Sequence, residues 1–338
     1  MFAPVLQEWI EIKRERGRLI DASRPLYDVL ADEYAQGMTS ARITAIFNDV
    51  KRDLAPFLLH LKQHGKRPDV KCLQGSFNVK AQEALGREIA AAMGFDFTKG
   101  RLDTSVHPCT FGIHSSDVRI TTRYKADDVM EALTGTVHEV GHALYEQGLN
   151  AEHDGLLVDA PCGMAVHESQ SLLWERMVML GLPFARFLLP KLQAAFPESG
   201  FGSVGAQELY RASNAMVDQS FIRVEADEVI RFVHCRPLSS LRQQVHYPLH
   251  VVLRFEIERD LLSGSSHVAP RTHICIQTCA CHICKFSHFR RVFCIGSSHN
   301  LEGKNAGVLG LHSSRRRYGL PTRRALEQRR LWILPHVS

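Results

Sequence analysis

Two histidines four residues apart, with a glutamate directly after the first, form the segment of this chain best suited to chemistry. The segment is His138-Glu139-Val140-Gly141-His142. On a helix, residues four positions apart lie on one face, so both imidazoles can bind a single metal ion. The glutamate lies beside that pair, where it can take a proton from water on the metal. The spacing therefore predicts a site for metal-assisted hydrolysis.

The flanking residues predict the helix that this spacing requires. Asp127 and Asp128 suit its N-terminus, and Gly148 suits its C-terminal end. Between them lies an apolar stripe at helical spacing, formed by Val129, Leu133, Val137, Val140 and Leu144. A five-residue motif also arises by chance, and a buried, hydrogen-bonded histidine is commoner than a metal ligand. The motif therefore needs a third ligand to support it.

The third ligand separates the classes of zinc protease. Metzincins have a histidine six residues after the second motif histidine and a glycine three residues after it. Here those positions hold Gly148 and Tyr145, which excludes that class. The other option is a glutamate on a following helix, and the helical segment 166–175 contains Glu168, 26 residues after His142. Two histidines and one carboxylate, with water in the fourth position, make a catalytic zinc site and not a closed structural one.

Composition places the chain among ordinary soluble globular proteins. It has 338 residues, of which 45% are hydrophobic and 23% charged, enough for one large domain or two smaller ones. No run of 18 apolar residues occurs, so no membrane helix is expected. Residues 1–19 lack the apolar core of a secretory signal. These features favour the cytoplasm and no membrane partner.

Helical periodicity dominates the sequence. Residues 6–63 and 81–93 have amphipathic helical patterns, with Thr39 as the N-cap of a helix that buries Ile43, Ile46 and Phe47. The exception is the run DVRITTRY at 117–124, whose β-branched residues indicate a short strand or ribbon. The predicted fold class is therefore mostly α, with a short β ribbon near 117–124.

The chain changes character near Gly264. Residues 265–338 hold 12 Lys+Arg and 2 Asp+Glu, a net charge of +10. The preceding 264 residues hold 29 Lys+Arg and 34 Asp+Glu, a net charge of −5. Five of the nine cysteines also lie in this last segment. The other four are scattered, which fits a reducing compartment better than a disulfide framework.

Six segments, in the same order and at similar intervals, resemble the carboxypeptidase Taq family of metallocarboxypeptidases. They are GRLDTSVHP, DVRITTRY, HEVGHALYEQG, HESQSLLWE, FIRVEADEV and YPLHVVLRFEIE. The resemblance covers most of residues 1–229 and resumes over 247–264. It implies a large helical zinc-peptidase fold with a deep groove, commonly a homodimer. It also implies removal of single residues from peptide C-termini with a divalent metal, usually zinc and sometimes cobalt.

The resemblance assigns roles to individual residues. His138, His142 and Glu168 match the family's metal ligands, and Glu139 matches its catalytic glutamate. Five further positions match motifs associated with the substrate groove: His107, Asp117, Arg119, Thr121 and Arg223. Cys109 stands where the family's His-Pro-Phe motif has phenylalanine, which leaves the shape of that part of the groove open.

Two assignments stay open at this stage. Recognition of a chain end requires a cation for the terminal carboxylate, and Arg119, Arg123 and Arg223 are all candidates. Each can equally be paired with a neighbouring aspartate. His167, next to Glu168, points about 100° away from it on a helix. It suits either a position behind the metal ligands or core packing.

The resemblance is interrupted at residues 230–246 and ends after Gly264, and the chain begins later than family members do. Three interpretations compete: a lineage-specific insertion with a new tail, a degenerate copy, or a flawed gene model. The last would combine read-through at 230–246 with a wrong frame after residue 264, and the lack of periodicity in 265–338 favours it. We accordingly predict a helical metallocarboxypeptidase domain over 1–264, incomplete at both ends, and a disordered or mistranslated basic tail over 265–338.

The tail has candidate functions of its own, which its sequence disfavours. A structural zinc site requires two ligand pairs about a dozen residues apart, but four cysteines crowd into the ten positions 275–284. The arginines from Arg315 onward could bind nucleic acid, yet so few apolar residues predict disorder. Nucleic acid is therefore not an expected partner.

The predicted function is hydrolysis of the C-terminal bond of peptides with broad specificity, using zinc, with cobalt as the alternative metal. Two rival hypotheses stay open. An endopeptidase would use the same site in an open-ended groove. A catalytically inactive, truncated homologue would still bind metal, because in the family later residues supply one wall of the groove.

Overall fold

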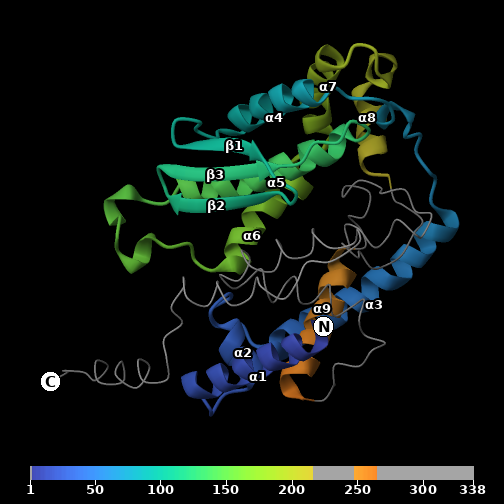
Figure 1. Cartoon of the computed structure of the whole chain (residues 1–338). Coiled ribbons are helices and arrows are strands. Elements are labelled where there is room, and N and C mark those ends of the chain that lie inside the picture. The colour runs from blue at the N-terminus through green and yellow to red at the C-terminus, as the bar shows by residue number, and fades with distance from the viewer. Residues whose placement is uncertain (1, 216–246, 265–338) are drawn as a thin grey trace, which may run out of the picture. The chain divides into compact units, whose positions relative to one another are not determined.

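The computed structural model describes residues 2–215 and 247–264 of the chain. Within these ranges helices predominate beside one small sheet, which confirms the predicted fold class (Figure 1). The helices are α1 (Phe2–Ile20), α2 (Leu26–Ala31), α3 (Ser40–His64), α4 (Val79–Met93), α5 (Val129–Gln147), α6 (Met164–Leu172), α7 (Leu182–Ala195), α8 (Ala206–Ser213) and α9 (Tyr247–Ser263). None of the helices in the described ranges is long and apolar enough to cross a membrane.

The N-terminal helices pack together with α9. Buried aliphatic side chains of α1, α2 and α9 form one cluster: Leu6, Ile10, Leu30, Leu261 and Leu262. The guanidinium of Arg14 on α1 donates hydrogen bonds to the carbonyls of Leu261 and Leu262 over 2.6 and 2.8 Å. These bonds satisfy acceptors at the C-terminal end of α9 that lack a partner within the helix.

Helix α3 begins as predicted, and its predicted buried face is only partly covered, with Ile43 and Phe47 half-buried. Oγ1 of Thr39 accepts a hydrogen bond from the backbone N–H of Arg42 over 3.2 Å, which confirms the N-cap. The prediction that Ile46 is buried was wrong, since it is 45% exposed. Its neighbour Phe47 meets the ring of Phe255 on α9 with centroids 5.2 Å apart, so α9 covers the side of α3 that carries Phe47.

The sheet has three strands, β1 (Gly100–Thr104), β2 (Cys109–His114) and β3 (Asp117–Thr122), in the order β1-β3-β2. Strand β3 pairs in parallel with β1 and antiparallel with β2. The predicted ribbon is therefore the central strand of a sheet whose other two strands the sequence did not predict. Val118 and Ile120 are buried under α5, and side chains alternate along a strand, so Asp117 and Arg119 lie on the opposite face.

Helix α5 lies against the sheet on one side and against other helices on the other (Figure 1). Its N-cap is Asp128, whose carboxylate accepts from the backbone N–H of Glu131 over 3.0 Å, and it ends at Gly148, as predicted. Val137 belongs to the apolar cluster shared with α4, α7 and α8, whereas Val140 belongs to the cluster against β1 and β3. Packing on two sides holds the remaining face of α5 in a fixed direction.

Helix α6 packs closely on α5 because Gly141 has no side chain. A Cβ at that position would lie 2.7 Å from Cα of Ser171 and 2.9 Å from the carbonyl oxygen of Gln170. The backbones therefore approach each other at the centre of the His138–His142 segment. A π-helical turn, Leu173–Val178, continues the chain beyond α6.

Candidate metal centre

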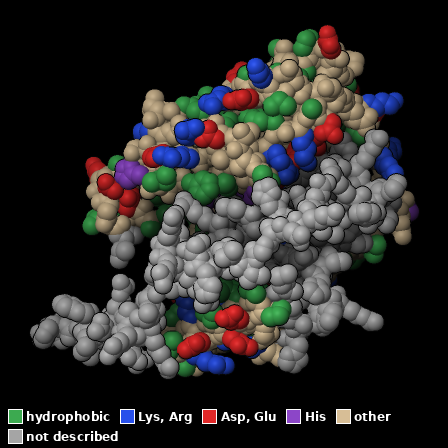
Figure 2. Space-filling model, viewed as in Figure 1, with side chains coloured by type: hydrophobic (Ala, Val, Ile, Leu, Met, Phe, Trp, Pro, Cys, Tyr) green, Lys and Arg blue, Asp and Glu red, His purple; other side chains and the backbone are tan. Residues whose placement is uncertain are grey.

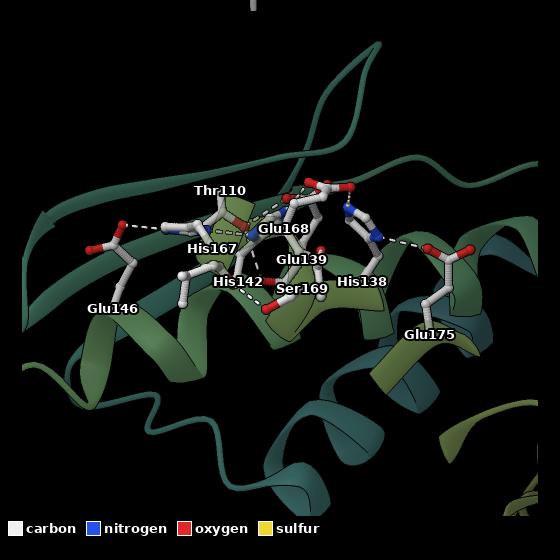
Figure 3. A network of polar contacts seen from close by, with 11 residues as sticks. Thr110, His138, Glu139, His142, Glu146, His167, Glu168, Ser169 and Glu175 are labelled. Atoms are coloured by element: carbon white, nitrogen blue, oxygen red, sulfur yellow. Dashed lines mark hydrogen bonds and ion pairs between the residues drawn. The ribbon is translucent and has the colours of Figure 1, made fainter. Parts of the chain in front are cut away.

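Two imidazoles of α5 and a carboxylate of α6 converge on one point (Figure 3). Nε2 of His142 lies 3.3 Å from Oε2 of Glu168, and Nε2 of His138 lies 3.8 Å from Oε1 of Glu168. One ligand atom from each residue lies within 4.8 Å of the others. The structure thus brings together the three side chains that the sequence singled out.

The spacing of these atoms suits a divalent metal ion. Zinc holds nitrogen and carboxylate ligands at about 2.0–2.2 Å, so two ligands of a tetrahedral site lie roughly 3.3–3.6 Å apart. The histidine–glutamate distances of 3.3 and 3.8 Å are close to that value. The side chain of Glu168 is 39% exposed, so the cluster is reachable from solvent on that side. Two imidazoles and one carboxylate therefore form a donor set that fits a metal with an open position.

A buried carboxylate holds the imidazole of His138 from behind. Oε2 of Glu175 lies 2.7 Å from Nδ1 of His138, and the Glu175 side chain is only 8% exposed. Burial lowers the pKa of His138, but the hydrogen bond to Glu175 and the charges of three nearby glutamates outweigh burial and raise the pKa above its ordinary value. With Nδ1 engaged by Glu175, the ring turns Nε2 toward Glu168.

The imidazole of His142 is held from behind by a second imidazole. Nδ1 of His142 lies 2.6 Å from Nδ1 of His167, and Nε2 of His167 lies 2.7 Å from Oε1 of Glu146 (Figure 3). His167 therefore lies behind a candidate ligand. This is one of the two roles that the sequence left open for it, the other being core packing. The ring of Tyr145 meets His167 edge-on, with centroids 5.3 Å apart.

Glu139 is fixed by strand β2. Oγ1 of Thr110 donates a hydrogen bond to Oε2 of Glu139 over 2.7 Å and also lies 3.0 Å from the Glu139 carbonyl oxygen. Glu139 is 6% exposed, so this contact lies in a sparsely hydrated place. Strand β2 thereby sets the direction of the carboxylate relative to the histidines of α5.

Sequence reasoning missed three residues of this site: Thr110, Glu146 and Glu175. For Glu146 a signal was present, because it follows His142 by four positions and so lies on the same face of α5. For Thr110 and Glu175 no local spacing carries the contact, because they reach the site from β2 and from the π-helical turn.

Strand β3 carries three of the residues predicted to bind substrate: Asp117, Arg119 and Thr121. His107 is exposed between β1 and β2. Arg119 donates two hydrogen bonds to Asp117 over 2.8 and 2.9 Å, on the face of the sheet turned away from α5. Oγ1 of Thr121 accepts from the backbone N–H of Cys109 over 3.1 Å. A role of these residues in substrate binding stays a prediction.

Charged side chains on that face of the sheet occur in pairs. Arg101 pairs with Asp103 over 2.6 Å, beside the pair of Arg119 and Asp117. Figure 2 shows basic and acidic side chains next to one another over this part of the molecule. Arg123, the other arginine candidate in the described ranges, donates to Glu131 over 3.0 Å through Nε.

Several predictions fall on residues that the structure does not describe. Arg223, the interruption at 230–246 and the tail at 265–338 lie outside the described ranges. Their assignments stay predictions.

Comparison with known proteins shows the family of the chain. The family model described as carboxypeptidase Taq (M32) metallopeptidase matches residues 1–273. The chain belongs to this family. The match to the M32 family runs past Gly264, the residue at which the motif resemblance ends.

Curated relatives support the same assignment. The chain is 36% identical over 272 residues to thermostable carboxypeptidase 1 of Thermus thermophilus, which covers 78% of this chain and 50% of that protein. It is 32% identical over 268 residues to carboxypeptidase 1 of Bacillus subtilis, a match that covers 79% of this chain and 50% of that protein. The chain therefore spans about half the length of the curated M32 relatives that it matches.

Solved structures show the same fold. The crystal structure of the M32 carboxypeptidase from Deinococcus radiodurans R1 matches with a TM-score of 0.68 and 33% sequence identity, over 79% of this chain and 50% of that one. Trypanosoma cruzi metallocarboxypeptidase 1 matches with a TM-score of 0.65 and 33% identity, over 78% of this chain and 52% of that one. The helical architecture with its small sheet is thus that of M32 carboxypeptidases.

Proposed function

We propose that this chain carries the active site of a zinc-dependent carboxypeptidase that removes residues from the C-termini of peptides with broad specificity. The observation that carries the proposal is the convergence of His138, His142 and Glu168 beside the buried carboxylate of Glu139. Membership of the M32 family, described as metallopeptidases, supports a divalent metal at this point.

His138 and His142 would hold the metal through Nε2, and Glu168 through its carboxylate. Zinc is the metal proposed here, with cobalt as the alternative, because two imidazoles and a carboxylate are the donor set of many catalytic zinc sites. When bound, such an ion supplies a Lewis acid that polarises the scissile carbonyl and makes a water molecule more acidic.

Glu139 is proposed as the general base. Its Oε2 is engaged by Thr110, so the proton of the attacking water is assigned to Oε1. The same carboxyl group would then pass that proton to the nitrogen of the departing amine. The hydrogen bond from Thr110 fixes the orientation of this carboxylate.

Recognition of the chain end is assigned to an arginine, because its planar fork pairs with a carboxylate through two hydrogen bonds. Arg119, Arg123 and Arg223 are the candidates. Arg119 and Arg123 already pair with carboxylates in the described structure, so either would have to exchange its partner for the substrate. His107, Asp117 and Thr121 are proposed to shape the groove, as the resemblance implies.

The catalytic region is assigned to residues 1–264, interrupted at 230–246, and 265–338 to a tail without a role in catalysis. Assembly as a homodimer and a cytoplasmic location are proposed from the resemblance and from the composition. Peptides are the proposed substrates, and neither a membrane nor nucleic acid is a proposed partner.

Two matched peptides test the function, one with a free C-terminus and one amidated. The purified chain loaded with Zn²⁺ should release the last residue of the free peptide and leave the amide intact. Glu139→Gln should lose turnover at least about 100-fold while keeping its zinc, because a general base contributes roughly 10²–10⁴-fold. Retained activity in that variant would remove Glu139 from the mechanism.

The same assay separates the two rivals. Internal cleavage of the amidated peptide would favour an endopeptidase. Stoichiometric zinc without turnover would favour a metal-binding homologue without activity. We include the inactive homologue as a rival because the chain spans about half the length of its curated relatives.

A further inference from the structure

We propose that Glu146 and His167 are positioning residues that hold His142 in the tautomer that binds metal, and that Gly112 on β2 provides the space they need. The inference rests on the proposed function in one respect, since it takes Nε2 of His142 as a metal ligand. It concerns two side chains that take no part in the chemistry itself.

A hydrogen bond between two imidazoles requires a proton on one of the two facing nitrogens and none on the other. Nδ1 of His142 and Nδ1 of His167 are 2.6 Å apart, so one of them donates and the other accepts. A metal on Nε2 of His142 leaves the proton of that ring on Nδ1, which is then the donor. His167 accepts at Nδ1 and carries its own proton on Nε2, 2.7 Å from Oε1 of Glu146. Every donor in this row of three side chains meets an acceptor.

The opposite arrangement of neutral rings leaves a mismatch. If Nε2 of His142 carried the proton, Nδ1 of His142 would accept from His167, whose Nε2 would then have no proton. That bare nitrogen would face the carboxylate of Glu146 across 2.7 Å, in side chains only 10% and 14% exposed. Two acceptors in contact in a poorly hydrated place are unfavourable. Glu146 therefore selects, through His167, the tautomer of His142 with Nε2 open to a metal.

Most metal-bound histidines donate directly to a carboxylate or a carbonyl. His138 follows that rule through Glu175. His142 reaches its carboxylate through a second imidazole, which carries the same constraint one side chain further. The two histidines of the motif are thus oriented by different carboxylates, one on α5 itself and one on the π-helical turn after α6.

Gly112 gives independent support. A Cβ at position 112 would lie 2.3 Å from Cδ of Glu146 and 2.4 and 2.6 Å from its two carboxylate oxygens. Any side chain there would displace the carboxylate from the place where it meets His167. The atoms in the way are the end of a flexible side chain, so Gly112→Ala should fold while moving Glu146. Strand β2 therefore leaves room for this contact at the one point where a side chain would break it.

The test compares zinc affinity across four variants of the full chain, measured by competition with a chromophoric chelator. They are Glu146→Ala, Glu146→Gln, Gly112→Ala and the control Gly202→Ala, whose Cβ would meet nothing within 4 Å. Circular dichroism and thermal unfolding of each metal-free variant report whether it folds. The absorption spectrum of the Co²⁺ form reports the geometry of the ligands, and ¹⁵N spectra of the histidines of the Zn²⁺ form report the tautomers.

Glu146→Ala and Gly112→Ala should each weaken zinc binding about 10-fold or more, the usual effect of losing a partner behind a ligand. Glu146→Gln keeps an acceptor and should recover most of the affinity, and Gly202→Ala should match the unaltered chain. His167 should carry its proton on Nε2 alone. Unchanged affinity and Co²⁺ spectra in folded Glu146→Ala and Gly112→Ala would overturn the inference, and so would a doubly protonated His167.

The outcomes for the site and for the function can be told apart. An unaltered chain that binds zinc but cleaves no peptide refutes the proposed activity, while the affinity series still decides the role of Glu146 and His167. An unaltered chain that binds no Zn²⁺ refutes both.

Discussion

Thr110 donates a hydrogen bond to Oε2 of Glu139 over 2.7 Å, which connects strand β2 to the proposed general base on α5. The contact explains why a small sheet accompanies a site made otherwise from helices. Helix α5 sets the position of the Glu139 backbone, and Thr110 of β2 sets the orientation of the Glu139 carboxylate. The proposed base is therefore held by a strand that contributes no metal ligand.

Replacement of Thr110 by Val should lower kcat and leave metal binding unchanged. Valine keeps the shape of the side chain but removes the donor, and a hydrogen bond to a charged group contributes about 1.5–3 kcal/mol. Since about 1.4 kcal/mol corresponds to a tenfold change in rate, kcat should fall roughly 10-fold or more. Thr110→Ser keeps the hydroxyl and should retain most of the activity. Equal kcat in the Val variant and the unaltered chain would show that Glu139 needs no such orientation.

Removal of Glu175 should weaken metal binding through His138. Glu175→Ala takes away the only carboxylate that contacts Nδ1 of His138 in the described part of the chain, so zinc affinity should fall about 10–100-fold. Glu175→Gln retains an acceptor, so its zinc affinity should lie between that of Glu175→Ala and that of the unaltered chain. The exposed Glu152, mutated to Ala, serves as the control for loss of one negative charge. A fall of the same size in that control would mean that net charge, and not contact with His138, sets the affinity.

The helix that carries the motif could be predicted because its signals are local. Asp128, Gly148 and the apolar stripe between them lie within 21 consecutive residues, and each acts on its own neighbourhood. The three candidate metal ligands followed from spacing and from the family resemblance, and the structure brings them together.

Strand β2 could not be predicted, because its apolar side chains point outward and its inward positions are polar or lack a side chain, the reverse of the usual pattern. Phe111 and Ile113 are 45% and 63% exposed, whereas Thr110 and Gly112 face α5. The inward positions are polar or without a side chain because they serve Glu139 and leave room for Glu146. A periodicity that assigns apolar residues to the inside misreads such a strand.

Replacement of Gly141 by Ala should damage both stability and metal binding. The added Cβ would lie 2.7 Å from Cα of Ser171, a backbone atom, so α6 must move away from α5 and take Glu168 with it. Overpacking of this kind costs about 1–3 kcal/mol in unfolding free energy. The matched control is Gly86→Ala on α4, where the nearest atom is 3.6 Å away. An alanine stabilises a helix by about 0.5–1 kcal/mol relative to glycine, so that control should gain stability.

Denaturant unfolding of both variants without metal, followed by zinc titration, checks this prediction. Stability should fall in Gly141→Ala and hold or rise in Gly86→Ala, and only Gly141→Ala should lose zinc affinity. A Gly141→Ala variant with both properties intact would mean that α6 tolerates the displacement without moving Glu168.

Stability should also depend on pH through Glu258 on α9. Burial raises the pKa of Glu258 above its ordinary value of 4.5, and the hydrogen bond with Tyr27 and the charge of Lys13 offset only part of that rise. A carboxyl group whose pKa is higher in the folded state binds its proton more tightly there. Its contribution to stability is therefore complete below pH 4.5 and is lost as the pH rises through the folded pKa. Glu258→Gln should remove that loss, so the stability of the variant relative to the unaltered chain should increase as the pH rises above 4.5.

Asp103 supplies a control of opposite sign for this titration. Its hydrogen bond to Arg101 lowers its pKa, so its contribution is present at neutral pH and is lost as the pH falls. The unfolding free energy of each variant minus that of the unaltered chain, measured in denaturant from acid to neutral pH, isolates one group at a time. The difference for Glu258→Gln should increase with pH above 4.5, and the difference for Asp103→Asn should decrease as the pH rises toward 3.8 and stay level above it. A flat difference for Glu258→Gln would show that this carboxylate is hydrated in the folded chain, because only desolvation makes its charged form unfavourable there.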